Sequence, residues 1–182
     1  GRGAAAMLIR SIDAQGNLIK KNPIDPETHK QMTNDFISFY KKNISGHSSI
    51  RKNVTSLLEW CKEKEIICAV CTNKREDLAI KLLKEIRLYQ YFDYIAGADT
   101  FDYRKPDPRH LTEILDILGV EKKNSIMLGD SETDANTAKA ANVYFVLIKD
   151  GYTEKNLKDI HHDHLIEDFE SVKQIAANYL KI

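Results

Sequence analysis

The stretch SIMLGDSETDAN, residues 125–136, decides the fold because the chemistry of the chain changes abruptly within it. Apolar residues run up to Gly129, and the acidic residues Asp130, Glu132 and Asp134 then follow in quick succession. A short apolar run that ends at a glycine is typical of a buried strand, whereas neighbouring carboxylates repel one another. The stretch therefore predicts a strand followed by a helix cap, a cation site or both.

Ser131 and Asp134 account for the helix cap. The spacing Ser-x-x-Asp fits a capping box, worth on the order of 1 kcal/mol, and predicts a helix over about 132–141. Asp130 is not explained by this cap, because it follows the strand and precedes the capping serine. Mg²⁺ is usually held by one or two carboxylates together with water and phosphate oxygens, so Asp130 is the candidate metal ligand.

The sequence on either side repeats this alternation of strand and helix. Apolar residues recur at helical spacing over 54–61, 79–86, 111–118 and roughly 168–180. Apolar strands are expected at IICAVCT (66–72), YIAGA (94–98) and VYFVLI (143–148). The pattern predicts a three-layer Rossmann-like α/β core, with a parallel sheet covered by helices on both faces. Ligands of such sheets bind beyond the carboxyl ends of the strands.

The amino-terminal quarter of the chain has a different pattern. Residues 5–12 carry the apolar stripe of an amphipathic helix, Pro26 lies in the first turn of a second predicted helix, and residues 45–49 resemble a linker. We expect a partial helical cap over 1–46 and the α/β core over 47–182. The chain begins at Gly1 and its first methionine is Met7, which indicates that Gly1 is not the natural translation start.

Composition limits the partners and the compartment. The 182 residues include 27 Lys+Arg and 27 Asp+Glu, and zero net charge argues against nucleic acid or an anionic membrane as partner. Apolar runs such as Ile66–Cys71 are far shorter than a membrane span. The odd number of cysteines favours buried thiols in a reducing cytoplasm. Cys68 and Cys71 would point to opposite faces of a strand, which argues against a zinc or redox pair.

Two further strand ends carry polar residues. At the first, Thr72 leaves a strand, and Asn73 with Glu76 could begin a helix whose backbone N–H groups favour an anion such as phosphate. At the second, Lys105 directly precedes Pro106, Asp107 and Pro108, which have the pattern of a helix start. The alternatives are that Asn73 serves only as a cap and that Lys105 is a solvated loop lysine.

Taken in order, Thr72-Asn73, Lys105-Pro106-x-Pro108 and Gly129-Asp130-Ser131-x-x-Asp134 resemble the haloacid dehalogenase-like hydrolases, in particular their phosphoglycolate phosphatase branch. The resemblance covers about residues 50–182. It implies that Thr72 and Asn73 bind phosphate, that Lys105 neutralises its charge, and that Asp130 holds Mg²⁺. Asp134 would orient Lys105 or metal-bound water. The implied reaction is Mg²⁺-dependent hydrolysis of a small phosphate monoester such as 2-phosphoglycolate, with Thr72, Lys105 and Asp134 as catalytic residues.

The nucleophile of that family, the first Asp of an Asp-x-Asp-Gly-Thr motif, has no match in this chain. The nearest candidate is Asp13, with Gln15 in the second position. The residues before Asp13 have helical rather than strand periodicity, and Gln15 cannot exchange a proton as a carboxylate does. We therefore expect the catalytic strand to precede Gly1, so that this chain is a truncated or processed piece of a phosphatase. Loss of a nucleophile can lower a rate about 10⁶-fold, by analogy with subtilisin.

Two alternative functions share parts of this pattern. A non-catalytic protein could keep the same phosphate and metal pocket for binding or for contact with another protein. A phosphorelay receiver domain also places Asp, Thr and Lys around Mg²⁺, but its acidic residues precede the Thr, whereas here they follow it. A sheet that lacks its first strand also favours a homo-oligomer, because an unpaired strand edge can recruit a second copy.

Overall fold

The computed structural model describes residues 25–42, 49–149, 151, 153 and 156–182. Residues 49–182 form one compact unit, and helix α3 (Pro26–Lys42) belongs to a second unit. Pro26 is the first residue of α3, as predicted. The Asp25 carboxylate accepts hydrogen bonds from the backbone N–H groups of Glu27 and Thr28 at 3.0 and 2.9 Å and so caps the helix. The helix predicted over residues 5–12 lies outside the described residues.

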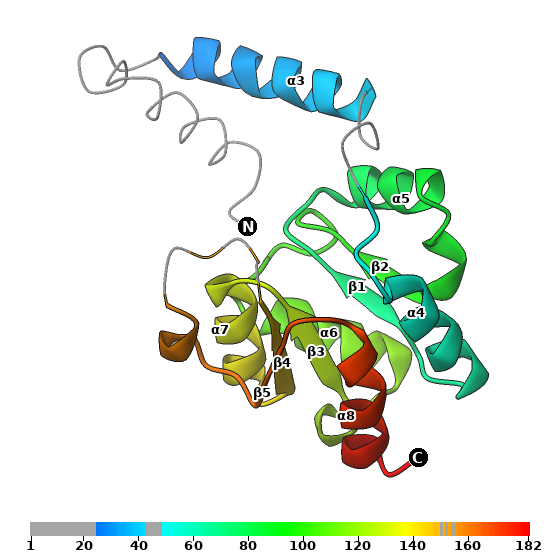
Figure 1. Ribbon diagram of the computed structural model, residues 1–182. Coiled ribbons are helices and arrows are strands. Elements are labelled where there is room, and N and C mark those ends of the chain that lie inside the picture. Colours follow the sequence, from blue (N-terminus) through cyan, green and yellow to red (C-terminus); the bar gives the residue numbers. More distant parts are fainter. Residues whose placement is uncertain (1–24, 43–48, 150, 152, 154–155) are drawn as a thin grey trace. The chain divides into compact units, whose positions relative to one another are not determined.

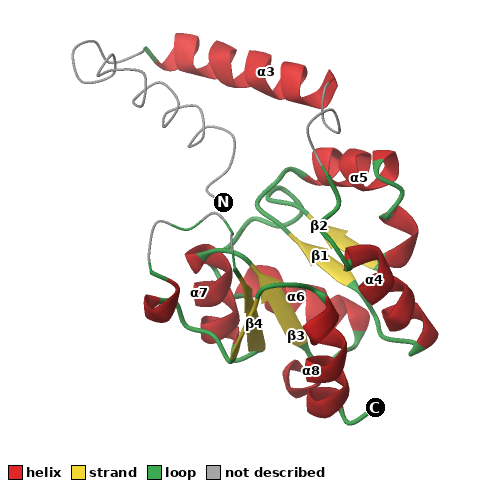
Figure 2. Ribbon diagram, viewed as in Figure 1, coloured by secondary structure: helices red, strands yellow, loops and turns green. Residues whose placement is uncertain are grey.

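Strands and helices alternate along residues 49–182 (Figures 1 and 2). In chain order the elements are α4 (Val54–Glu63), β1 (Ala69–Cys71), α5 (Glu76–Glu85), β2 (Tyr94–Ala96), α6 (Arg109–Leu118), β3 (Ile126–Gly129), α7 (Glu132–Ala141), β4 (Tyr144–Ile148), β5 (His164–Ile166) and α8 (Glu170–Leu180). Short 3₁₀ turns lie at 89–91, 122–124 and 157–159. The predicted α/β alternation is confirmed, while β5 was not predicted.

The strands form two parallel sheets. β1 pairs with β2 in one sheet, and the other has the order β3-β4-β5. Although β1 and β3 both lead toward the residues singled out by the sequence, they belong to different sheets. Leu128 on β3 is 36% exposed, whereas the residues of β4 from Phe145 to Ile148 are all buried.

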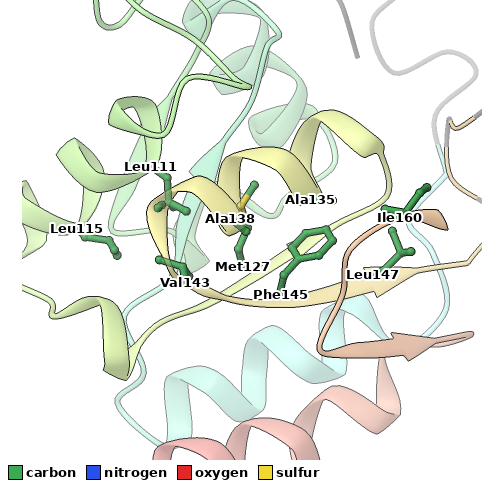
Figure 3. Close-up of a cluster of buried hydrophobic side chains, with 10 residues drawn as sticks. Leu111, Leu115, Met127, Ala135, Ala138, Val143, Phe145, Leu147 and Ile160 are labelled. Carbon is green, nitrogen blue, oxygen red and sulfur yellow. The ribbon is translucent and has the colours of Figure 1, made fainter. Parts of the chain in front are cut away.

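Strand β4 divides the apolar core between two faces. Phe145 and Leu147 pack with residues of α6 and α7 on one face (Figure 3). Val146 and Ile148 point the other way, into a cluster with residues of α4, β5 and α8. Successive side chains of a strand alternate between its faces, so the buried residues of this one strand pack against two helix layers. The three-layer α/β architecture expected from the sequence is confirmed.

None of the described helices contains an apolar stretch of the length needed to cross a membrane.

Candidate active site

The carboxyl ends of the parallel strands carry the residues that the sequence singled out. Thr72 directly follows β1, Lys105 lies between β2 and α6, and Asp130 directly follows β3. This edge is the usual ligand-binding edge of parallel α/β sheets. The residues therefore come from three successive connections between a strand and a helix.

The Lys105 ammonium group links the end of β1 to the start of α7. Its Nζ lies 2.6 Å from Asp134 Oδ1 in the first turn of α7, and it also donates to the carbonyl oxygen of Cys71, at 2.6 Å, at the end of β1. The side chains of Lys105 and Asp134 are each only 9% exposed. Lys105 is therefore not a solvated loop lysine. An ammonium group has three donors, so these two contacts leave one for a ligand oxygen.

The Asp134 carboxylate forms both the helix cap and the ion pair. Its Oδ2 accepts from the Ser131 hydroxyl at 2.6 Å and from the backbone N–H groups of Ser131 and Asp130 at 3.2 Å each. The predicted capping box is thus confirmed. Burial by itself raises the pKa of Asp134, but the Lys105 charge and these hydrogen bonds outweigh burial and lower the pKa overall. Asp134 is therefore a stable anion.

Gly129 makes room for this carboxylate. A Cβ atom at Gly129 would lie 2.5 Å from Asp134 Cβ and 2.9 Å from Cε2 of Phe145. Real Cβ atoms essentially never come that close to other heavy atoms. Only glycine therefore lets the end of β3 pack directly against the Asp134 side chain.

Asp130 is a half-buried carboxylate in an unfavourable electrostatic position. Burial and then the negative charge of Asp134 raise its pKa, while the charges of Lys105 and Arg51 oppose the rise. A Cβ atom at Gly151 would lie 2.2 Å from the Asp130 carbonyl oxygen, so the connection after β4 touches the Asp130 backbone. A cation beside Asp130 would relieve the cost of its charge.

Thr72 extends the pairing of β1 by one residue. Its backbone N–H donates to the Ala96 carbonyl at 3.0 Å. Its hydroxyl oxygen accepts a hydrogen bond from the backbone N–H of Lys74 at 3.1 Å. Because this bond uses a lone pair, the hydroxyl proton remains available to a ligand.

The predicted start of helix α5 is wrong. The helix begins at Glu76 with Arg75 as its N-cap, and Asn73 makes no cap. Instead, the Asn73 side-chain amide donates to the Lys105 carbonyl at 2.9 Å. The Glu76 backbone N–H, which the sequence analysis expected to favour phosphate, donates to Asp99 Oδ1 at 2.8 Å. Asp99 lies on the loop after β2, far from Glu76 in the sequence, so local sequence patterns could not predict this contact.

Helix α6 also starts one residue later than predicted, at Arg109, although Asp107 Oδ1 still accepts from the Arg109 backbone N–H at 2.9 Å. The next residue, His110, was not singled out. It is 0% exposed and contacts the segment that carries Lys105. A polar residue beside Leu111, at the start of an apolar helix face, was the signal that could have drawn attention to it.

Comparison with known proteins gives the family. The profile described as "Haloacid dehalogenase-like hydrolase" matches residues 9–148. A protein of Mesorhizobium japonicum named phosphoglycolate phosphatase is 34% identical over 180 residues, which is 99% of this chain and 77% of the relative. A protein of Caulobacter vibrioides with the same name is 33% identical over 180 residues, covering 99% and 74% of the two chains.

Solved structures share the fold. A crystal structure of a predicted phosphoglycolate phosphatase from Haemophilus somnus superposes with a TM-score of 0.89 at 24% identity, covering 96% of this chain and 78% of the other. A β-phosphoglucomutase from Clostridium difficile superposes with a TM-score of 0.75 at 21% identity, covering 99% and 79%. One fold thus accommodates proteins described by different reactions. The family expected from the sequence motifs is confirmed, and the chain belongs to the haloacid dehalogenase-like hydrolases.

Proposed function

We propose that the chain carries the phosphate- and metal-binding part of a Mg²⁺-dependent phosphatase that acts on a small phosphate monoester such as 2-phosphoglycolate. The observation that supports this best is the buried Lys105 ammonium, held between Asp134 and the Cys71 carbonyl at the strand ends. The names of the two relatives at 34% and 33% identity support the choice of substrate.

Lys105 has the role of neutralising charge on the phosphate. Phosphate monoesters hydrolyse extremely slowly unaided, so a catalyst must stabilise the negative charge that is redistributed in the transition state. An ammonium group with few water contacts interacts more strongly with an anion than a solvated one does. Asp134 and the Cys71 carbonyl fix the ammonium in advance, so little reorganisation is needed when the phosphate binds.

Thr72 has the role of hydrogen-bond donor to a phosphate oxygen. Its oxygen already accepts from the Lys74 N–H, which directs the hydroxyl proton elsewhere. Asn73 was expected to bind phosphate as well. Because its amide is bonded to the Lys105 carbonyl, we assign it to holding the lysine segment.

Asp130 fits a Mg²⁺ ligand. Within the described ranges, no three His, Cys, Asp or Glu side chains gather closely enough to hold a metal by themselves. Mg²⁺ does not require such a cluster, because it is usually held by one or two carboxylates completed by water and phosphate oxygens. Bound Mg²⁺ would supply positive charge to the phosphoryl oxygens, and the raised pKa of Asp130 from burial and Asp134 marks a carboxylate that a cation would stabilise.

The nucleophile is assigned to a further strand, upstream of Gly1, that would lie in space between β1 and β3. These two strands belong to separate sheets although both end at the site, and Leu128 on β3 is partly exposed. Asp130 and Asp134 already serve as proposed metal ligand and lysine partner. The earlier candidate Asp13 lies outside the described residues. We also propose that residues 1–46 belong to a helical cap and that residues 47–182 form the α/β core.

The test compares two lysine variants of the chain. Lys105→Met removes the buried ammonium, and Lys139→Met removes an exposed lysine of α7 as a matched control. Hydrolysis of 2-phosphoglycolate and of 4-nitrophenyl phosphate is measured with Mg²⁺, and binding of inorganic phosphate is measured by calorimetry. We expect Lys105→Met to weaken phosphate binding by the chain and, once the upstream catalytic strand is present, to lower kcat/KM by about 10²–10³-fold, the usual effect of removing one stabiliser of transition-state charge.

Turnover that is unchanged in Lys105→Met would refute the assignment. Phosphate binding without turnover by the unmodified chain is expected either for a piece that lacks the catalytic strand or for the non-catalytic binding protein, and hydrolysis by an upstream-extended chain separates the two. The same chain is then extended upstream by a strand that carries an Asp nucleophile. Hydrolysis of the esters by this extended chain would support the proposed place of the nucleophile. Absence of both binding and turnover in the presence of Mg²⁺ would overturn the proposal.

A further inference from the structure

His110, the second residue of α6, is fully buried beside the lysine segment. Its Nδ1 lies 3.3 Å from the Lys105 backbone nitrogen, and its Nε2 lies 3.0 Å from the Gly97 carbonyl oxygen just after β2. The Cys71 sulfur, at the end of β1, lies 3.8 Å from Nδ1. The imidazole therefore contacts three segments that converge on the proposed site.

These neighbours select one tautomer of the imidazole. A backbone N–H can only donate and a backbone carbonyl can only accept. Nδ1 must therefore accept from Lys105, and the proton must reside on Nε2, where it is donated to Gly97. The Cys71 thiol can add a second, weaker donor to Nδ1. Every polar atom of the ring is satisfied in this neutral form.

A second proton on His110 would place an N–H on Nδ1 against the N–H of Lys105. Burial, and then the charge of Lys105, lower the pKa of His110, while the Gly97 carbonyl and Asp107 oppose the shift. The electrostatics and the hydrogen-bond geometry therefore favour the same neutral form.

Asn73 holds the other side of the same residue. Its side-chain amide donates to the Lys105 carbonyl at 2.9 Å. Side chains from α6 and from the loop after β1 therefore hold both main-chain polar groups of Lys105. His110 binds the N–H and Asn73 binds the carbonyl. A backbone fixed at both groups limits where the ammonium at the end of the side chain can lie.

We infer that His110, in its Nε2-protonated form and together with Asn73, is a positioning residue that fixes the Lys105 peptide groups and so places the ammonium for phosphate. This inference rests on the proposed function of Lys105. Loss of the Nδ1 acceptor would leave the Lys105 N–H buried without its partner, and the segment would shift to satisfy it. A histidine that only fills space would have no such link to Lys105.

Two substitutions separate the two halves of the ring. His110→Asn keeps a polar group near the Nδ1 position, where its oxygen can accept from Lys105. His110→Gln keeps a donor near the Nε2 position, toward Gly97, and lacks the acceptor. The exposed His161→Gln serves as control. For each full chain, inorganic phosphate affinity, turnover of 4-nitrophenyl phosphate, thermal unfolding and the ¹⁵N resonance of the Lys105 amide are measured.

We expect His110→Gln to shift the Lys105 amide resonance and to weaken phosphate binding about tenfold, which equals about 1.4 kcal/mol. The phosphate affinity of His110→Asn should stay within about threefold of that of the unmodified chain. This difference between the two variants is expected even if they unfold at the same temperature. Equal effects of Asn and Gln on phosphate binding, with an unmoved Lys105 resonance, would reduce His110 to a packing residue and overturn the inference.

One measurement needs no variant. Imidazole ¹⁵N resonances of the unmodified chain must show the proton of His110 on Nε2, and a proton on Nδ1 would overturn the inference even if both variants failed to fold. If the chain neither binds phosphate nor hydrolyses esters, the proposed function fails. The Lys105 amide and the His110 tautomer still decide whether His110 fixes that segment.

Discussion

The ammonium nitrogen of Lys105 lies 2.6 Å from Oδ1 of Asp134, a residue 29 positions further along the chain. The same carboxylate closes the capping box at the start of α7 through its second oxygen. One side chain therefore fixes both the first turn of a helix and the cation of the proposed site. Local helix formation and site geometry depend on the same group.

Removing the ammonium is expected to destabilise the fold as well as the site. Lys105→Met leaves Asp134 buried without its counterion, and breaking a buried ion pair in this way lowers the free energy of unfolding by about 3–5 kcal/mol. Urea unfolding measures this loss. The exposed control Lys139→Met should stay within about 0.5 kcal/mol. In a double-mutant cycle with Asp134→Asn the two losses should not add, and strict additivity would show that the pair is not coupled.

Lowering the pH should remove the contribution of Asp134 to stability. Its folded pKa is lowered, with the Lys105 charge and hydrogen bonds outweighing burial, so it contributes stability above the unfolded pKa of about 3.9. That contribution is lost as the pH falls through the folded value. The unmodified chain should therefore be more stable than Asp134→Asn at neutral pH, and the difference should shrink below about pH 4. Unfolding curves measured at several pH values check this, and a difference that stays constant would contradict it.

The contribution of Asp130 to stability should change with pH in the opposite direction. Its folded pKa is raised by burial and by Asp134, so its favourable contribution is present below the unfolded pKa and is lost as the pH rises through the folded value. Without metal, Asp130→Asn is therefore expected to be at least as stable as the unmodified chain at neutral pH.

Magnesium should reverse that order. Binding to the folded state alone raises the free energy of unfolding by about 2.7 kcal/mol when the free ion is at 100 times its Kd. The melting temperature of the unmodified chain should rise with Mg²⁺ and fall again with EDTA, while that of Asp130→Asn should respond to neither. The exposed Asp116→Asn provides the control. If the melting temperatures of the unmodified chain and of Asp130→Asn responded equally to Mg²⁺, Asp130 would not be the ligand.

Two glycines allow a test of the packing at the site. Gly129→Ala places a methyl group 2.5 Å from Asp134 Cβ and should lower stability by about 1–3 kcal/mol through overpacking, with a loss of phosphate binding. Gly119 ends α6 with a φ of +67° and has nothing within 4 Å of its missing Cβ. Gly119→Ala should therefore lower stability by about 1 kcal/mol through backbone strain and leave phosphate binding unchanged. If both variants lost binding equally, displacement of Asp134 would not be the cause.

Local patterns predicted a large part of the fold. Apolar stripes predicted α4, α5 and α6, and the Ser131 to Asp134 spacing predicted α7 together with a capping box that the structure contains. These features depend on residues three or four positions apart, so the sequence displays them directly. Strand β5 escaped because two of its three residues, His164 and Leu165, are exposed, which leaves no apolar run to detect.

Contacts between distant segments were not predictable in the same way. Asp99 reaches the first N–H of α5 from another loop, and Asn73 reaches Lys105 instead of capping a helix. His110 joins Gly97 to Lys105 only because α6 packs against β1 and β2. Motif order indicated which residues meet at the strand ends, while their individual hydrogen bonds depended on loop conformation.

The Lys105 ammonium contacts the end of the β1–β2 sheet through Cys71 and the start of α7, which follows β3, through Asp134. It thus lies between two sheets that share no strand pairing among the described residues. An anion that binds there would also strengthen the contact between the two sheets. We therefore expect phosphate to slow amide hydrogen exchange in β1 and in β3 together.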